Sequence, residues 1–127
     1  MLLGLVGRGM SRRLPFDRVA YERRSREGPC FICAIADGDP EYRGPTTMIY
    51  EDTEVLVFLN RYPTLRGYTL VCPGRHVERV IGDLSETEYL RLQQWVDRVG
   101  QAVQAVVPTE RLYLLSLGSQ QANRHVQ

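Results

Sequence analysis

The sequence predicts an α+β fold in which an antiparallel sheet carries one long helix and a short N-terminal helix, all helices lying on one face. Three observations predict this class. Short apolar runs bounded by turn residues stand before and after a single long amphipathic segment, no internal repeat occurs, and 127 residues can bury one hydrophobic core but not two. The composition, with 43% hydrophobic and 24% charged residues, is that of an ordinary globular domain.

Residues 1–27 differ from the rest because they carry seven arginines against three acidic residues. We interpret them as a basic N-terminal extension, a solvated tail that runs into a short helix at about residues 15–26. The domain itself is placed at residues 28–127. The apolar opening of the chain is too short for the core of a signal peptide, and no run approaches the length of a membrane helix.

Two strands are predicted at residues 48–51 and 55–59, where short apolar runs form a hairpin. The second run is continuously apolar, so it is expected to be buried on both faces. A third strand is predicted at residues 67–71, stopped by Pro73 and Gly74, with a short helix or turn at about residues 76–81.

The long helix begins at Ser85, which forms a capping box with Glu88 three residues later. Apolar residues then recur at spacings of three and four and so share one helical stripe: Tyr89, Leu92, Val96, Val99, Val103 and Val106. Pro108 ends this helix, and a fourth strand is predicted at residues 112–117. The chain closes with an incomplete last strand at residues 124–127.

Charge and residue types exclude several kinds of function. The formal net charge of +1 provides no global field that would attract nucleic acid or an anionic membrane. All sixteen basic residues are Arg, so Schiff-base chemistry and a P-loop lysine are excluded. Three cysteines do not indicate a secreted disulfide framework, and a reducing cytoplasm is the expected compartment.

Four residues predict a metal site. The spacing of Cys30 and Cys33 fits a redox pair, half of a zinc site or a coincidence. His76 and His125, the only histidines of the chain, complete a Cys₂His₂ set, the ligands of a structural, tetrahedral zinc ion. Taken singly, each histidine would be interpreted as an ordinary surface or core residue.

Three motifs in order resemble the histidine-triad (HIT) family: the Cys30 to Cys33 pair, the segment 58–76 and the segment 121–127, which resembles the approach to the closing His-x-His-x-His motif. Segment 58–76 resembles the core of HIT proteins in a form close to the branch that hydrolyses dinucleoside polyphosphates. The resemblance covers residues 28–127. It implies a HIT-like sheet, a nucleotide or dinucleoside polyphosphate as partner, and a homodimer that joins sheets and long helices.

The resemblance also implies roles for individual residues. Cys30, Cys33, His76 and His125 would bind zinc, in agreement with the ligand count above. Asn60 would hold the ribose hydroxyls, although a turn residue at the end of a strand is the structural alternative. Ser119, Gln121 and Asn123 belong to the loop that would approach the nucleotide phosphate, with an ordinary polar turn as the alternative. Cys72 is interpreted as a buried strand residue.

The sequence departs from the family at Gln127, the position of the histidine that attacks the α-phosphate. A carboxamide cannot replace that nucleophile, the third histidine would lie beyond the last residue, and Tyr68 stands where many relatives have a histidine. The resemblance therefore implies a nucleotide-binding protein whose family chemistry is nucleotidyl hydrolysis or transfer, with this chain inactive. A silent, zinc-stabilised nucleotide-sensing or interaction module is the alternative.

Overall fold

A five-stranded antiparallel sheet forms the centre of the computed structural model, which describes residues 2–6, 15–116 and 124–127. The strands, in spatial order β2-β3-β4-β1-β5, are β1 (Leu2–Val6), β2 (Met48–Glu51), β3 (Val55–Leu59), β4 (Thr69–Pro73) and β5 (Arg111–Leu115). The helices are α1 (Arg18–Glu27), α2 (Phe31–Ala36), α3 (Pro40–Arg43), α4 (Val80–Asp83) and α5 (Glu86–Val106). The predicted α+β class with an antiparallel sheet and one long helix is confirmed.

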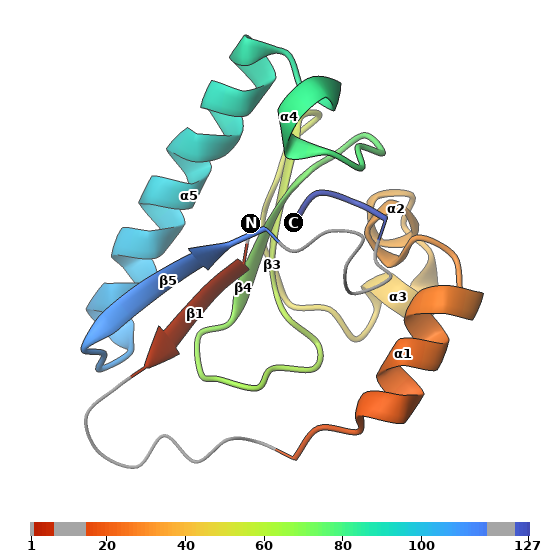
Figure 1. Ribbon diagram of the computed structural model, residues 1–127, viewed down its shortest axis with the longest axis horizontal. Coiled ribbons are helices and arrows are strands. Elements are labelled where there is room, and N and C mark those ends of the chain that lie inside the picture. Colours follow the sequence, from red (N-terminus) through yellow and green to blue (C-terminus); the bar gives the residue numbers. More distant parts are fainter. Residues whose placement is uncertain (1, 7–14, 117–123) are drawn as a thin grey trace.

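Helices cover both faces of the sheet, so the prediction of helices on one face is wrong. Figure 1 shows α5 on one side of the central strands and α1, α2 and α3 on the other. Alternate residues of β3 explain this arrangement, because Val55 and Val57 pack with α5 whereas Leu56 and Phe58 pack with α2. The expectation that this strand is buried on both faces is confirmed, and a second apolar face requires a second helical layer.

The long helix α5 forms as predicted. The hydroxyl of Ser85 accepts a hydrogen bond from the Glu88 N–H at 3.2 Å, and the Glu88 carboxylate accepts one from the Ser85 N–H at 2.8 Å. Its buried residues are Leu92, Val96, Val99, Gly100 and Val103. Val106, the last residue of the predicted stripe, is exposed where the helix ends. The apolar stripe therefore holds α5 against the sheet through its middle turns.

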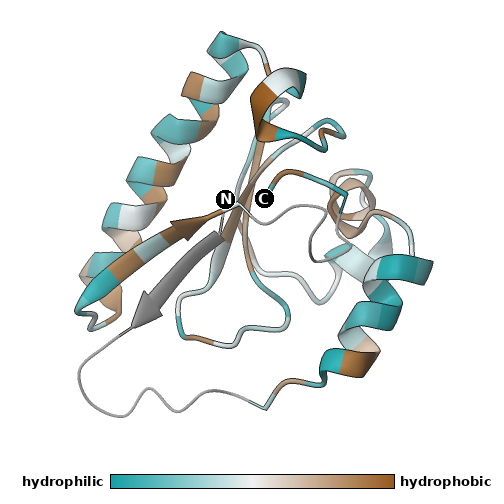
Figure 2. Ribbon diagram, in the orientation of Figure 1, coloured by the Kyte–Doolittle hydropathy of each residue, from teal (hydrophilic) through white to brown (hydrophobic). Residues whose placement is uncertain are grey.

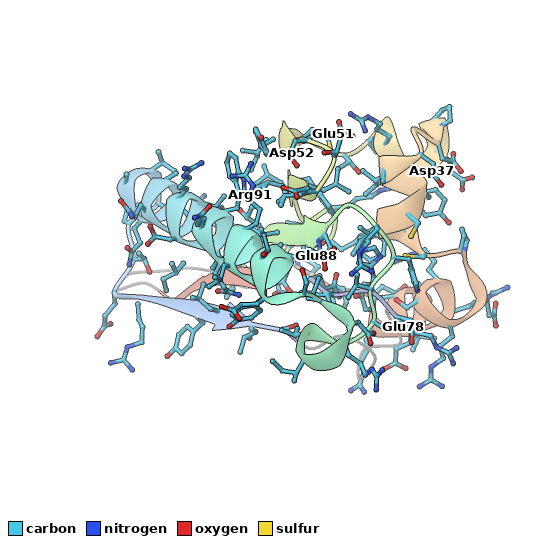
Figure 3. All side chains as sticks on the ribbon, turned by 90° about the horizontal axis from the view of Figure 1, so that it is seen from above. Asp37, Glu51, Asp52, Glu78, Glu88 and Arg91 are labelled. Atoms are coloured by element: carbon cyan, nitrogen blue, oxygen red, sulfur yellow. The ribbon has the colours of Figure 1, made fainter. Side chains whose placement is uncertain are left out.

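Asp52 organises the turn between β2 and β3. Its carboxylate accepts hydrogen bonds from the N–H groups of Glu54 and Val55, from the Tyr50 hydroxyl and from Arg91 of α5. Figure 3 shows Arg91 directed toward Asp52 from the helix. Burial raises the pKa of Asp52, but these hydrogen bonds outweigh it and lower the pKa to about 2. The charged carboxylate thus links the hairpin to α5.

The first strand of the sheet lies in the segment interpreted as a solvated tail, and for residues 2–6 that interpretation is wrong. β1 pairs with β5 from Leu2↔Leu115 to Val6↔Arg111, and also with β4 through Leu2↔Leu70 and Leu3↔Thr69. An inserted strand satisfies backbone groups on both β4 and β5, which would otherwise be open edges. The helix expected at residues 15–26 is confirmed as α1.

Residues 124–127, where an incomplete last strand was predicted, form no strand. The Val126 N–H donates to the Val77 carbonyl at 2.6 Å. His125, Val126 and Gln127 are nevertheless buried, with Val126 in the core that faces α5. Burial therefore fixes these residues against the loop after β4 without a strand ladder.

Among the described residues, none of the helices combines the length and apolar character that crossing a bilayer requires.

Candidate functional site

Three separate segments bring the four predicted metal ligands together. Cys30 caps the N-terminus of α2, Cys33 lies in its first turn, His76 follows β4, and His125 belongs to the buried chain end. The Cys30 sulfur lies 3.2 Å from Nδ1 of His125, and the Cys33 sulfur lies 3.3 Å from Nδ1 of His76 and 3.7 Å from Nδ1 of His125. All four ligand atoms lie within 4.8 Å of one another, so the cluster can hold a metal ion.

The spacing of these atoms fits a tetrahedral ion. Metal–sulfur lengths of about 2.3 Å and metal–nitrogen lengths of about 2.0–2.1 Å place neighbouring ligand atoms roughly 3.3–3.8 Å apart in a tetrahedron. The contacts between Cys sulfur and His nitrogen, 3.2–3.7 Å, lie close to that range. Four protein ligands leave no open coordination position, which is typical of a structural site and not of a catalytic one.

Both histidine rings are oriented for binding through Nδ1. The Nε2–H of the buried His125 donates to the Pro73 carbonyl at 3.0 Å, and the Nε2–H of His76 donates to the Glu78 carboxylate at 3.3 Å. Such outer partners fix the tautomer and leave the Nδ1 lone pair toward the ion. The hydrogen bond from His125 also ties the site to β4, because Pro73 is the last residue of that strand.

The electrostatics suit neutral imidazole ligands. Burial, with a contribution from neighbouring His76, lowers the pKa of His125 to about 4 although the bond to Pro73 opposes the shift. Burial and the adjacent Cys30 raise the pKa of Cys33 to about 12. In the absence of an ion the thiol is therefore protonated, and a bound metal has to displace that proton.

A pocket of about 360 Å³ adjoins the ligand cluster through shared segments. Phe31 and Ile35 of α2 line it on the same short helix that carries the two cysteines, and Gln127 lines it two residues after His125. Phe58 and Leu70 of the sheet complete an apolar wall. The loop after β3 adds polar and aromatic groups: Asn60, Arg61, Tyr62, Thr64 and Tyr68. Its size and mixed lining are typical of small-molecule sites.

Asn60 and Gln127, two of the residues singled out in the sequence, line this one pocket. Gln127 is 4% exposed, and Asn60 is half-buried. The Asn60 side-chain oxygen accepts a hydrogen bond from the Tyr62 N–H at 2.9 Å, so the turn role considered for this residue is present. Ser119, Gln121 and Asn123 lie outside the described residues.

Tyr68 occupies the position at which, by the resemblance, many relatives have a histidine. Burial raises its pKa to about 12, and a hydrogen bond between its hydroxyl and the Asn60 side chain opposes that shift. The phenol is therefore neutral at pH 7 and cannot act as a base there. Cys72 is fully buried in the core beside Phe58 and Leu70, which confirms its interpretation as a structural residue.

The sequence interpretation missed two features of the pocket. Helix α1 contributes Tyr21, Arg24 and Ser25 to the lining, although it was assigned to a solvated extension. Helices α2 and α3 form in a stretch for which no helix was predicted, and cap signals could have indicated both. The Cys30 sulfur accepts from the Cys33 N–H, and Asp39 caps α3 with Pro40 in its first turn.

Comparison with known proteins agrees with this geometry. A model of the HIT domain matches residues 42–126. An uncharacterised HIT-like protein of Methanocaldococcus jannaschii is 42% identical over 50 residues, 39% of this chain and 36% of that one. The protein hit of Bacillus subtilis is 41% identical over 51 residues, 40% and 32% of the two chains. The matched part of this chain thus spans about a third of the length of these relatives.

A solved structure of a HIT family protein from Bacillus anthracis superposes with a TM-score of 0.64 and 28% sequence identity, covering 76% of this chain and 65% of that one. The similarity therefore extends over most of this chain.

Proposed function

Because this chain belongs to the HIT domain family, we propose that it binds a nucleotide in the pocket beside the Cys₂His₂ cluster and does not hydrolyse it. One observation carries the proposal. Asn60, matched to the ribose-binding position, and Gln127, matched to the nucleophile position, line the same pocket although 67 positions separate their residue numbers. A pocket of about 360 Å³ with an apolar inner wall is of a suitable size for a nucleoside and its first phosphate.

The proposal assigns Asn60 two compatible tasks. Its side-chain oxygen is engaged by the Tyr62 N–H, and this bond holds the amide in a fixed direction. The amide nitrogen carries two N–H donors: one is used by the hydrogen bond to the Tyr68 hydroxyl, and the other can donate to an oxygen of the ribose diol. The turn therefore orients the group that recognises the sugar, which lowers the entropic cost of binding.

Gln127 supports binding without turnover. The family reaction forms a bond between a histidine nitrogen and the α-phosphorus while the bond from phosphorus to the leaving oxygen breaks. The amide nitrogen of a glutamine side chain has its electron pair delocalised into the carbonyl and cannot make that attack. Its N–H groups can donate hydrogen bonds to phosphate oxygens, so the position keeps a binding role.

The ion that the proposal assigns to the cluster is zinc. Two thiolates and two imidazoles in tetrahedral arrangement favour this ion, which has no geometric demand of its own. Bound zinc would tie α2, the loop after β4 and the buried chain end together, and its chemistry here would be structural. Free thiols at Cys30 and Cys33 are needed for binding, so the proposal places the protein in a reducing cytoplasm.

A homodimer joined through β5 and α5 is the expected assembly. β5 is an edge strand, and its Tyr113, Leu114 and Leu115 are exposed, as is Val106 at the end of α5. An open apolar edge of this kind favours pairing with a second sheet. Sedimentation equilibrium should give twice the chain mass, and Leu114→Lys should shift the equilibrium to monomer; a monomer at all concentrations would refute the assignment.

Titration calorimetry with adenosine 5′-monophosphate tests the function. The wild-type chain should bind one nucleotide, and Asn60→Ala should weaken binding by about tenfold or more, the effect of losing one or two hydrogen bonds in a buried site. Gln94→Ala, which removes a side-chain amide from the exposed surface of α5, is the matched control and should leave the affinity unchanged. Melting curves and metal content confirm that each variant is folded.

Two outcomes would reject the proposal. If the wild-type chain gives no saturable heat with the nucleotide, the pocket is not a nucleotide site and a zinc-stabilised interaction module is the better description. If Asn60→Ala binds as tightly as wild type, the nucleotide is held elsewhere and Asn60 is a turn residue alone.

A further inference from the structure

Helix α1 forms the outer wall of the pocket although none of its residues is buried. Aromatic rings attach it to the rest of the molecule: Phe16 packs on Tyr21 with centroids 5.2 Å apart, and Tyr21 meets the edge of Tyr62 at 6.5 Å. Figure 2 shows α1 mostly in hydrophilic colours, unlike the neighbouring α2. The helix therefore brings charged groups, together with the Tyr21 ring, to the mouth of the pocket.

Two guanidinium groups meet at this mouth on one aromatic ring. The guanidinium of Arg24 lies 4.5 Å from the centre of the Tyr62 ring, and that of Arg61 lies 5.5 Å from it. Stacking on an aromatic face fixes the plane of a guanidinium while its N–H edge stays available to an anion. The pair is thus organised before any ligand arrives.

Neither guanidinium is neutralised by a carboxylate in the part of the chain that the structure describes. On α1, Arg18 pairs with Glu22 and Arg23 with Glu27, whereas Arg24 forms no such pair. Arg61 donates to the backbone carbonyl of Glu41 at 3.5 Å. The Glu41 side chain also lines the pocket, so the lining keeps a formal surplus of one positive charge.

We propose that Arg24 and Arg61, stacked on Tyr62, form a second anion subsite that binds a phosphate on the ribose hydroxyl side of the nucleotide. The inference rests on the proposed function and narrows its ligand to nucleotides with phosphates on both the 5′ and the 3′ or 2′ oxygens. Arg61 directly follows Asn60, the residue assigned to the ribose hydroxyls, so a phosphate on one of those oxygens falls beside the guanidinium pair.

The two ends of the pocket separate the two phosphates. Gln127 is the last residue, and Figure 1 marks the chain end close to the central strands, away from α1. Arg24 and Arg61 are exposed, on α1 and on the loop after β3. If the 5′-phosphate binds at Gln127, the arginine pair faces the opposite side of the sugar. Bidentate guanidinium contacts there suit a dianionic phosphate.

The test compares three nucleotides by calorimetry at one ionic strength: adenosine 5′-monophosphate, adenosine 3′,5′-bisphosphate and adenosine 5′-diphosphate. The bisphosphate should bind about tenfold more tightly than the monophosphate, because it adds charge-assisted hydrogen bonds. Arg24→Gln and Arg61→Gln should each reduce that ratio, and the double variant should bring it close to one. Arg26→Gln, on the same exposed helix but outside the pocket lining, should leave it unchanged.

Each other result overturns the inference in a recognisable way. Equal affinity for the monophosphate and the bisphosphate would reject the second anion subsite but leave the proposed function in place. A tenfold ratio that survives in the double variant assigns the second phosphate to other residues. If adenosine 5′-diphosphate binds more tightly than the bisphosphate, and the arginine variants remove that gain in affinity, the two arginines bind the second phosphate of the 5′-diphosphate instead. Failure of all three nucleotides to bind rejects the proposed function itself.

Discussion

Removing the metal is expected to lower the melting temperature of this chain by about 10 °C or more, the largest stability effect that the structure predicts. The ion would link three segments that lie far apart in the sequence: α2, the loop after β4 and the buried residues at 124–127. Structural zinc sites contribute roughly 10–16 kcal/mol of apparent binding free energy in small peptides, which is comparable to the free energy of unfolding of a typical domain, about 5–15 kcal/mol.

Calorimetric melting with and without excess chelator measures the effect, with zinc counted by native mass spectrometry. Cys33→Ser should abolish stoichiometric zinc and melt at the temperature of the chelated protein. Cys72→Ala is the matched control, because this cysteine is buried in the core and outside the cluster. It should lose some stability from the cavity yet keep one zinc per chain. An unchanged melting curve in chelator would exclude the structural zinc.

Hydrolysis of a dinucleoside polyphosphate or a nucleoside phosphoramidate by this chain should be nearly or fully absent. Loss of the nucleophile in an unrelated hydrolase lowers turnover by on the order of a millionfold, and Gln127 leaves no nucleophilic histidine in the pocket. Tyr68, neutral at pH 7 with a pKa of about 12, does not replace it. Release of nucleoside monophosphate by the purified chain is the measurement.

Gln127→His is the matched variant for this prediction. It returns an imidazole to a buried position of the pocket, and a covalent nucleotidyl-histidine should then be detectable as an added nucleotide mass. Measurable hydrolysis by the wild-type chain at the rate of Gln127→His would contradict the account, because it would show that hydrolysis proceeds without a histidine at this position.

The four residues that could hold a metal ion were predictable from the sequence because their chemistry is restrictive. The chain has only two histidines, and a tetrahedral ion needs two more ligands of the kind that Cys30 and Cys33 supply. The long helix was equally predictable, since its capping box and its apolar stripe are local signals that packing then reinforced. Both predictions rest on residues whose role depends little on distant partners.

Features that depend on distant partners were not predictable. The pentapeptide 2–6 is apolar, but nothing local indicates that it inserts between β4 and β5. Helix α1 is hydrophilic, so its periodicity does not reveal a side that faces a pocket, and its Tyr21 and Arg24 gain a role only beside Tyr62. The second helical layer was not predicted, although the sequence did indicate the two-sided burial of β3 that requires it.

A crystal structure of the zinc-loaded chain with adenosine 5′-monophosphate tests the central claim most directly. The account predicts a nucleotide in the pocket between α1, α2 and the loop after β3, with its ribose against Asn60 and its phosphate at Gln127. The pocket empty at saturating nucleotide, or the nucleotide bound on the opposite face beside α5, would contradict it.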